Sequence, residues 1–242
     1  MRRAIDYDLD QERAYTYKGK APDELITHLA RFVSGLWQIH AFGEGNTRTT
    51  AVFTIQYLRS LGFDVDNDQF AKHSWYFRNA LVRANYRNVA KGIEYTPVYL
   101  ERFFRNLLLG EQWDLRNRYL HIHPTSEWSV QPNLATPTST PASTPTSTLA
   151  NSLNPNSKFY TNNNAIIELV RVIGAEELSI KQMMEIKGLK DRKNFIDYHL
   201  EPALKEKFVR RKYPDRPNHP RQKYLLTAKG VALYNELTKG VM

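Results

Sequence analysis

The residues whose types are best suited to catalysis or ligand binding lie together in the segment HAFGEGNTR, residues 40–48. Two glycines two positions apart, Gly43 and Gly45, let the main chain approach an anion closely. A helix predicted to begin near Asn46 would direct its first N–H groups toward that anion. The spacing therefore favours a loop that binds phosphate groups.

Three side chains of the same segment can act on a bound phosphate. His40 can accept a hydroxyl proton near neutral pH. Glu44 can ligate Mg²⁺, a hard ion that takes carboxylate and phosphate oxygens together. Arg48, in the first helical turn, offers a planar cation that fits phosphate oxygens. Each residue alone is usually structural, so the prediction depends on their joint order.

Two helices must position this loop. Apolar residues recur at spacings of three and four from 22 to 39, which predicts a helix that begins at a proline. A second periodic segment runs from 46 to 61, and Gly62 is expected to end it. Further helical patterns occur at 68–91 and 95–109. The part of the chain from 1 to 123 is therefore predicted to be mainly helical.

A segment rich in Pro, Ser and Thr follows at 124–157 and contains TPTSTPASTPTST. It holds few residues that could anchor a core, so it cannot offset the entropy lost on ordering. We expect an extended, disordered linker that separates residues 1–123 from a second folded unit at 158–242.

The second unit shows an order of elements that is typical of a winged helix-turn-helix. Its predicted helices and strands follow one another as three helices, a hairpin and a last helix. Their expected ranges are 163–173, 179–187 and 191–206 for the helices, 208–212 and 222–227 for the strands, and 228–238 for the last helix.

This unit also carries most of the positive charge. The whole chain has a formal net charge of +9, and residues 158–242 hold 17 Lys and Arg against 10 Asp and Glu. Such an excess favours an anionic partner, commonly nucleic acid, although a soluble domain with a basic surface is an equal alternative. The residues expected to meet DNA are Lys190, Arg192, Lys193, Arg210, Arg211 and Lys212. The unit could instead bind protein, including a second copy in a homodimer.

Composition excludes several other classes of protein. Hydrophobic residues make up 41% and charged residues 24%, which is typical of a soluble globular chain. There is no cysteine, so disulfides and thiolate zinc sites are excluded. No apolar run approaches the ~20 residues of a membrane span, and no signal peptide is evident, so we expect a cytoplasmic protein without a membrane partner. The HIH triplet at 121–123 lacks a convincing third ligand, which argues against a metal site there.

The loop resembles the motif of the Fic family, written H-P-F-x-(D/E)-G-N-G-R-x-x-R. The matching residues are His40, Phe42, Glu44, Gly45, Asn46 and Arg48, all at the correct spacing. The resemblance extends over most of residues 22–110. It implies a mainly α protein with a helical Fic core of the Fido fold, joined here through the linker to a C-terminal winged helix-turn-helix.

The resemblance also implies an activity. Fic enzymes transfer AMP from ATP to a protein hydroxyl, so we expect a Mg²⁺-dependent protein adenylyltransferase that modifies another protein or itself. His40 would deprotonate the hydroxyl, and Glu44 would bind Mg²⁺. Phe42 would anchor the loop in the core. The phosphates of the nucleotide would be held by the loop and the first helical turn, through Gly43, Gly45, Asn46, Thr47 and Arg48.

Three residues depart from the motif. Ala41 replaces the usual proline, Thr47 replaces a glycine, and Ala51 replaces a second arginine that contacts the γ-phosphate in the family. Thr47 fits poorly at a positive φ but costs little in a helix. No (S/T)-x-x-x-E-(G/N) inhibitory motif is present. These departures leave two alternatives: transfer of another nucleotide or a phosphate, and a DNA-binding regulator with a weakened Fic core.

The segment DYDLDQERAYTYKG, which precedes the first predicted core helix, shows no clean hairpin pattern. Fic enzymes usually place a β-hairpin flap before the core, and this flap clamps the target beside the active site. We therefore expect the sequence either to be a fragment or to begin inside the flap, which would impair target positioning more than ATP binding.

Overall fold

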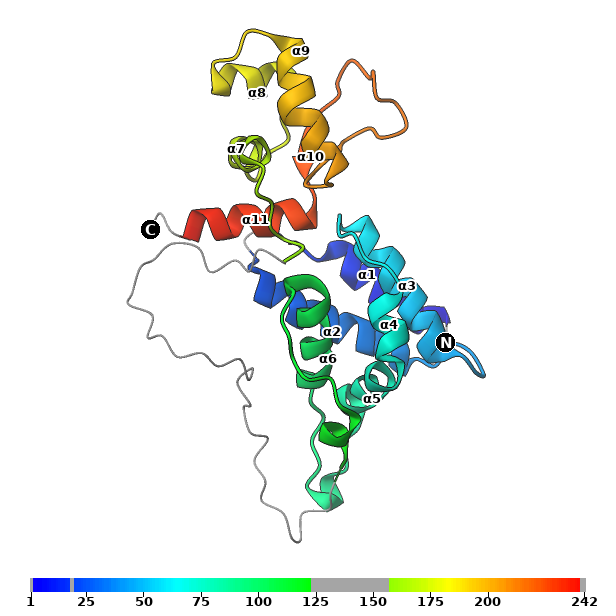
Figure 1. The fold of residues 1–242 in the computed structure, drawn as a ribbon. Helices are drawn as coiled ribbons and strands as arrows, with labels where there is room; N and C mark the ends of the chain where they lie inside the picture. The colour runs from blue at the N-terminus through cyan, green and yellow to red at the C-terminus, as the bar shows by residue number, and fades with distance from the viewer. Residues whose placement is uncertain (1, 18–19, 123–156, 240–242) are drawn as a thin grey trace, which may run out of the picture. The chain divides into compact units, whose positions relative to one another are not determined.

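The computed structural model describes residues 2–17, 20–122 and 157–239 (Figure 1). These residues are mainly helical, as predicted. The predicted linker, apart from its last residue, lies outside them, as does one histidine of the HIH triplet. Within the described part of the chain, no helix is long and apolar enough to cross a membrane.

The chain forms two compact units, and neither is continuous in sequence. The first unit comprises residues 1–15, 26–55 and 66–151. The second comprises residues 16–25, 56–65 and 152–242. The helices that flank the candidate loop therefore contribute residues to both units. The domain boundaries expected at 123 and 158 stay predictions.

The N-terminal part follows the predicted periodic segments with two differences: the pattern at 68–91 forms two helices, the second of which ends at Asn85, and an additional helix precedes residue 22. That additional helix, α1 (Arg2–Ala14), is dominated by charged and polar residues, so its sequence gives little apolar periodicity. The other helices are α2 (Pro22–Gln38), α3 (Asn46–Ser60), α4 (Asp68–Lys72), α5 (Ser74–Asn85), α6 (Val98–Phe104) and a π-helical extension at Arg105–Leu109, with short 3₁₀ turns at Val89–Lys91 and Asn117–Leu120.

An aromatic cluster forms the centre of the first unit. The rings of Phe70, Phe77 and Phe103 lie 5.0 Å apart, centroid to centroid, in each of the three pairs. Leu29 and Val33 of α2 are also fully buried. Burial of large apolar side chains at this density is the main favourable contribution to folding, so α2 is fixed as a rigid element.

A buried carboxylate holds α1 to α2 within this unit. Glu12 is only 8% exposed, and its Oε2 lies 2.6 Å from Nε2 of His28. The ring of Tyr15 stacks on the same imidazole at a centroid distance of 3.4 Å. A buried acidic group needs such a partner, so these contacts determine where α1 lies on α2.

The C-terminal part contains three helices and a hairpin in the order on which the winged-helix prediction depends. The first two helices are α7 (Asn164–Ile173) and α8 (Ile180–Lys187). The third is continuous and consists of α9 (Arg192–Phe195), a π-helical stretch (Ile196–Leu200) and α10 (Glu201–Lys205). The strands β1 (Val209–Arg211) and β2 (Tyr224–Leu226) follow, and α11 (Ala228–Lys239) is the last helix. The two strands pair antiparallel, with Val209 opposite Leu226. Leu178 adds two hydrogen bonds to Tyr224 of β2, at 2.8 and 3.0 Å.

The end of α3 is part of the second unit. Gly62 ends the helix at φ +103°, and a Cβ there would lie 2.6 Å from the carbonyl oxygen of Lys207. Only glycine permits this approach. The amide of Lys229 donates to the carbonyl of Leu61 at 3.2 Å. The polypeptide after α3 is thereby tied into the C-terminal core.

Lys229 is a buried cation in this unit. Its Nζ donates to the carbonyl of Glu206 at 3.0 Å and lies 3.9 Å from the centroid of the Phe208 ring. Burial lowers the pKa of Lys229 to about 8. Removing an ammonium group from water disfavours its charged form, so this lysine reduces stability while it remains protonated.

We predict that the free energy of unfolding rises with pH because of Lys229. Below pH 8 the folded and unfolded chains both carry the proton, and the cost of burial is present in full. Between about 8 and about 10.5 only the unfolded chain keeps it, so stability increases, by about 3 kcal/mol over the window. Urea unfolding at several pH values should show this rise in the native chain and a flatter profile in Lys229→Met. An equal slope in Lys229→Met and in the exposed control Lys205→Met would contradict the prediction.

Candidate active site

The loop between α2 and α3 begins at His40. The amide of His40 donates to the carbonyl of Trp37 at 3.1 Å, and the residue has a left-handed φ of +50°. A left-handed residue ends a helix by turning the chain away from its axis. His40 is exposed, as a proton acceptor for an incoming hydroxyl must be. The loop that follows is light blue in Figure 1 and projects from the ends of the two helices.

The side-chain amide of Asn46 closes this loop. Its Nδ2 donates to the carbonyl of Phe42 at 2.7 Å, and its Oδ1 accepts from the amide of Phe42 at 2.9 Å. Gly45, directly before it, has φ +74°, a conformation that favours glycine. Asn46 thus has a structural role in the loop, and its contact with phosphate stays a prediction.

The start of α3 presents main-chain amides near Gly45. The amide of Thr49 donates to the carbonyl of Gly45 at 3.0 Å and makes the first hydrogen bond of the helix. The amides of residues 46–48 come before it and have no partner within the helix. Nη2 of Arg48 lies 4.0 Å from the position that a Cβ on Gly45 would take. The amides that begin α3 and a guanidinium therefore both lie near Gly45, an arrangement that suits an anion.

Thr47 lies in the first turn of α3. Among the described residues other than glycine, only His40 and Lys207 have a positive φ, so Thr47 has no backbone strain of that kind. The replacement of the motif's glycine is therefore compatible with the local structure. Ala51 lies one turn further along the same helix.

Phe42 does not anchor the loop. Its side chain is 53% exposed, so the predicted burial in the core is wrong. The reason is the projection of the loop, which carries residue 42 beyond the ends of the helices. Gly43 is also exposed, and nothing lies within 4 Å of the Cβ position there.

Glu44 has the exposure that a shared Mg²⁺ ligand needs, and its binding of the ion stays a prediction. Its side chain is exposed and makes no hydrogen bond or ion pair within the described residues. Those residues also contain no group of three or more His, Asp or Glu that could enclose a metal ion. Mg²⁺ is commonly held by one or two carboxylates together with substrate phosphates, so a single carboxylate beside a phosphate site suits this ion.

Sequence reasoning missed a contact at the base of the loop. Nε1 of Trp37 donates to Oγ1 of Thr47 at 3.1 Å. The Trp37 ring also lies edge to face against the His40 ring, with 4.9 Å between centroids and 75° between planes. Trp37 lies in the last turn of α2 and His40 follows three residues later, a spacing that brings side chains together on a helix surface. The spacing could have indicated their contact, but the hydrogen bond across the loop depends on tertiary structure.

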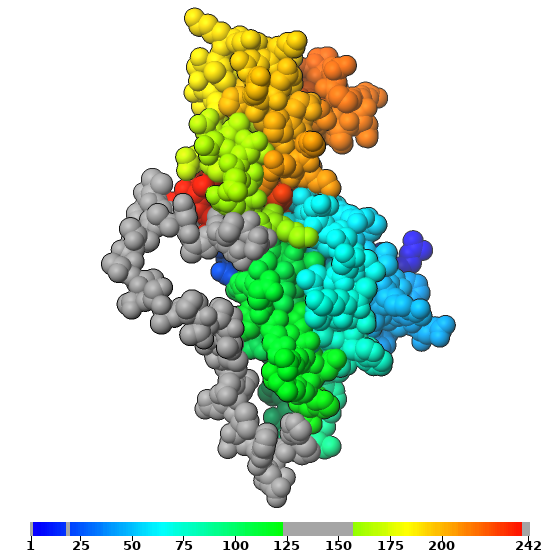
Figure 2. Space-filling model, viewed as in Figure 1, coloured from blue at the N-terminus to red at the C-terminus, as the bar shows by residue number. Residues whose placement is uncertain are grey.

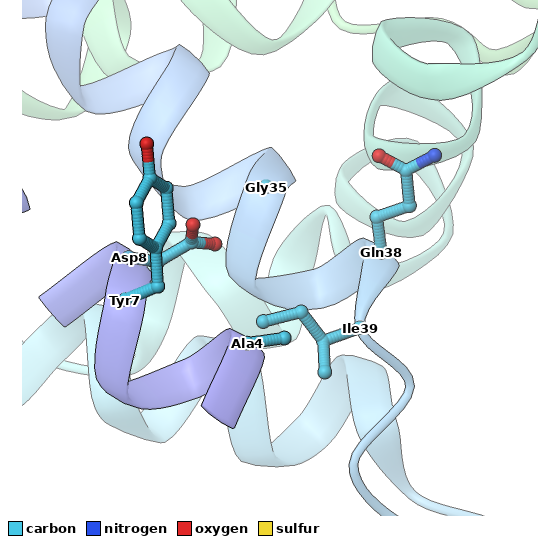
Figure 3. A pocket seen from close by; sticks show the side chains of 6 residues that line it. All are labelled: Ala4, Tyr7, Asp8, Gly35, Gln38 and Ile39. Carbon is cyan, nitrogen blue, oxygen red and sulfur yellow. The ribbon is translucent and has the colours of Figure 1, made fainter. Parts of the chain in front are cut away.

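A shallow hollow of about 430 Å³ lies between α1 and α2 in the same unit. Figure 3 shows Tyr7 and Asp8 of α1 beside Gly35 of α2, with Gln38 and Ile39 at the other side. A Cβ on Gly35 would lie 3.6 Å from Oδ2 of Asp8, which is an ordinary van der Waals contact. The hollow ends at the residue that precedes His40.

The structure divides the six candidate DNA-binding residues into two groups. Arg211 and Lys212 form ion pairs with Glu201 at 3.7 Å and Glu177 at 2.5 Å. The hydrogen bond with Glu177 raises the pKa of Lys212. The other four are exposed and form no ion pair within 4.0 Å in the described residues: Lys190, Arg192, Lys193 and Arg210. The hydrogen bond from Lys212 lowers the pKa of Glu177, and the charge of Arg210 adds to this effect.

A groove of about 620 Å³ runs beside these residues in the second unit. It lies between the start of α8, the helix that begins at Arg192 and the turn at 217–222. Its charged lining consists of three cations and one acid: Lys181, Arg192, Arg211 and Glu201. The turn, orange in Figure 2, protrudes from the surface of this domain.

Comparison with known proteins agrees with the motif. A profile of the Fic/DOC family matches residues 3–58, which include the loop and its flanking helices. A second profile, described as the C-terminal domain of the Fic-like protein "filamentation induced by cAMP", matches residues 164–227. Two separate segments of the chain are therefore similar to Fic family proteins.

One solved structure is similar, that of a Fic family protein from Desulfovibrio desulfuricans. The match has 20% sequence identity and a TM-score of 0.26, and it covers 84% of this chain. The chain spans 49%, about half, of that protein's length. No curated protein matches the chain.

We predict that the two glycines of the loop differ in their tolerance of a side chain. Gly45→Ala should lower the free energy of unfolding by about 1–2 kcal/mol, because an L-residue is strained at φ +74°. Gly43→Ala is the matched control, since it has neither a positive φ nor a near neighbour. Chemical denaturation of the three proteins measures both effects. Equal stabilities of the two variants would show that the loop does not hold Gly45 in this conformation.

Proposed function

We propose that this chain transfers AMP from ATP to a hydroxyl side chain of a protein, which is either another protein or the chain itself. The observation that carries the proposal is the arrangement of the loop at 40–48. An exposed histidine ends α2, unpaired amides begin α3, and an arginine lies near Gly45. The match of residues 3–58 to the Fic/DOC family supports the general kind of chemistry.

At phosphorus, the reaction forms one P–O bond and breaks another. The target hydroxyl attacks the α-phosphorus, the bond from that phosphorus to the bridging oxygen breaks, and pyrophosphate leaves. His40 takes the hydroxyl proton. The amides at 46–48 and the Arg48 guanidinium stabilise negative charge on the phosphates, so most of the acceleration comes from positioning and from fixed charge.

Glu44 would hold Mg²⁺ beside the phosphates. Bound there, the ion would neutralise phosphate charge and orient the leaving group. Gly43, Gly45 and the main-chain amide of Thr47 would belong to the wall of this nucleotide site, while the hydroxyl of Thr47 accepts from Trp37. Because Ala51 has no charged side chain, this chain offers no guanidinium at that position for a γ-phosphate.

The test is retention of label on protein from α-labelled ATP with Mg²⁺, with a cell lysate as the source of targets. We predict that His40→Ala and Glu44→Ala each lower the labelling by at least about a hundredfold, because general bases and charge-stabilising groups contribute on this scale. The controls are His121→Ala and Glu94→Ala, which remove a histidine and an exposed carboxylate outside the loop.

Three results would count against AMP transfer by this loop. Labelling that survives both loop substitutions would assign the activity to other residues. Labelling from a different nucleotide or from γ-labelled ATP, with none from α-labelled ATP, would keep the site but change the transferred group. The absence of any transfer would leave the second candidate as the function of the chain.

The second candidate is a regulator that binds DNA through the C-terminal domain. The observation that favours it is the group of exposed cations at the start of α9, which form no ion pair within the described residues. They lie beside a groove whose charged lining residues are three cations and one acid. In a winged-helix arrangement this helix would enter the major groove and the turn at 217–222 would lie near the backbone. A domain that binds protein or a second copy is the competing interpretation.

We predict that Arg192→Ala combined with Lys193→Ala weakens binding to a short labelled duplex at least tenfold and lowers the salt slope by about 1–2. The matched control removes two exposed cations that do not line the groove, through Arg171→Ala and Lys205→Ala. Fluorescence anisotropy over a salt series measures both quantities. Equal losses in the two double variants would indicate non-specific attraction. No binding at about 50 mM salt would rule out the DNA function.

A further inference from the structure

Thr47 and Trp37 form a brace that ends at the imidazole of His40. The Trp37 indole donates to the Thr47 hydroxyl at 3.1 Å, and its ring contacts the His40 ring at a centroid distance of 4.9 Å. Thr47 belongs to α3, whereas Trp37 belongs to the last turn of α2 and His40 is the second residue after that helix. The brace therefore spans the loop and links the element that holds the phosphates to the residue that takes the proton.

We propose that Thr47 is a positioning residue: its hydroxyl fixes Trp37, and Trp37 fixes the orientation of the His40 ring. This inference rests on the proposed function, in which His40 is the proton acceptor. It assigns a use to the threonine that replaces the glycine of the motif. Glycine has no side chain, so it could not make this hydrogen bond.

The need for a brace follows from the backbone at His40. A residue other than glycine at φ +50° is strained by about 1–2 kcal/mol, and such residues persist only where their surroundings hold them. His40 is exposed and has no hydrogen bond from its ring within the described residues. The contact with the Trp37 ring is thus the one that restricts the imidazole.

The indole is suited to this role. Trp37 is half-buried and has only two side-chain torsions, so one hydrogen bond at Nε1 fixes the whole ring. Thr47 is half-buried as well, which shields the bond from water. Its β-branched side chain is stiff in a helix, so the acceptor oxygen is held in place.

The experiment compares Thr47→Val, which keeps the shape and removes the acceptor, with Thr47→Ser, which keeps the acceptor. Thr49→Val is the control, because Thr49 lies in the same part of α3, is exposed, and has no side-chain hydrogen bond within the described residues. We expect Thr47→Val to lower kcat about tenfold and to leave KM for ATP within about twofold, since a misplaced base affects the transition state and not nucleotide binding. Thr47→Ser should restore kcat.

A readout independent of turnover is the NMR signal of the His40 ring, assigned by its loss in His40→Ala. The ring current of Trp37 should displace this signal, and Thr47→Val should shift or broaden it while Thr47→Ser returns it. Trp37→Phe, which removes the N–H and keeps a ring, should act non-additively with Thr47→Val if the two residues form one unit.

The outcomes separate this inference from the proposed function. A His40 signal that responds to Thr47, in a protein that labels no target, would support the brace and refute AMP transfer by this site. The brace would be overturned if labelling needs His40 while Thr47→Val changes neither kcat nor the NMR signal of His40. A rise in KM for ATP with kcat unchanged would assign Thr47 to nucleotide binding and overturn it as well.

Discussion

The two hydrogen bonds between the Asn46 side chain and the main chain of Phe42 are the constraint on which the candidate site depends. They close a short loop that must end one helix and begin the next. Because the loop is closed, the left-handed His40 and the open amides of α3 lie at its two ends at fixed positions. The proposed chemistry needs this rigidity, since a base and a phosphate site act together only when they are held together.

The flanking helices are fixed from several directions. The aromatic cluster packs in the core of the first unit, and the buried Glu12 attaches α1 to α2 through His28. The other end of α3 is tied to the second unit, where Gly62 admits the Lys207 carbonyl and Lys229 donates to Leu61. The same helix thus begins with the candidate phosphate site and ends in the C-terminal core.

The two candidate functions depend on different electrostatic features. The loop uses main-chain amides and one arginine near a glycine, an arrangement that acts on a phosphate at short range. The C-terminal domain presents cations on an open surface, two of which its own carboxylates already engage. A surface of that kind attracts an anionic partner through the sum of its charges, and salt screens this attraction.

The sequence by itself determined the helices, the order of elements in the C-terminal domain and the identity of the loop, because apolar periodicity, glycines and a spaced motif are local features. It did not determine α1, whose polar residues carry little periodicity and whose place depends on the burial of Glu12. It also placed Phe42 in the core, whereas the projection of the loop leaves that ring exposed. Only the tertiary structure decided that Thr47 meets Trp37 and that Lys212 pairs with Glu177, because these contacts join residues from different elements whose distance no local pattern encodes.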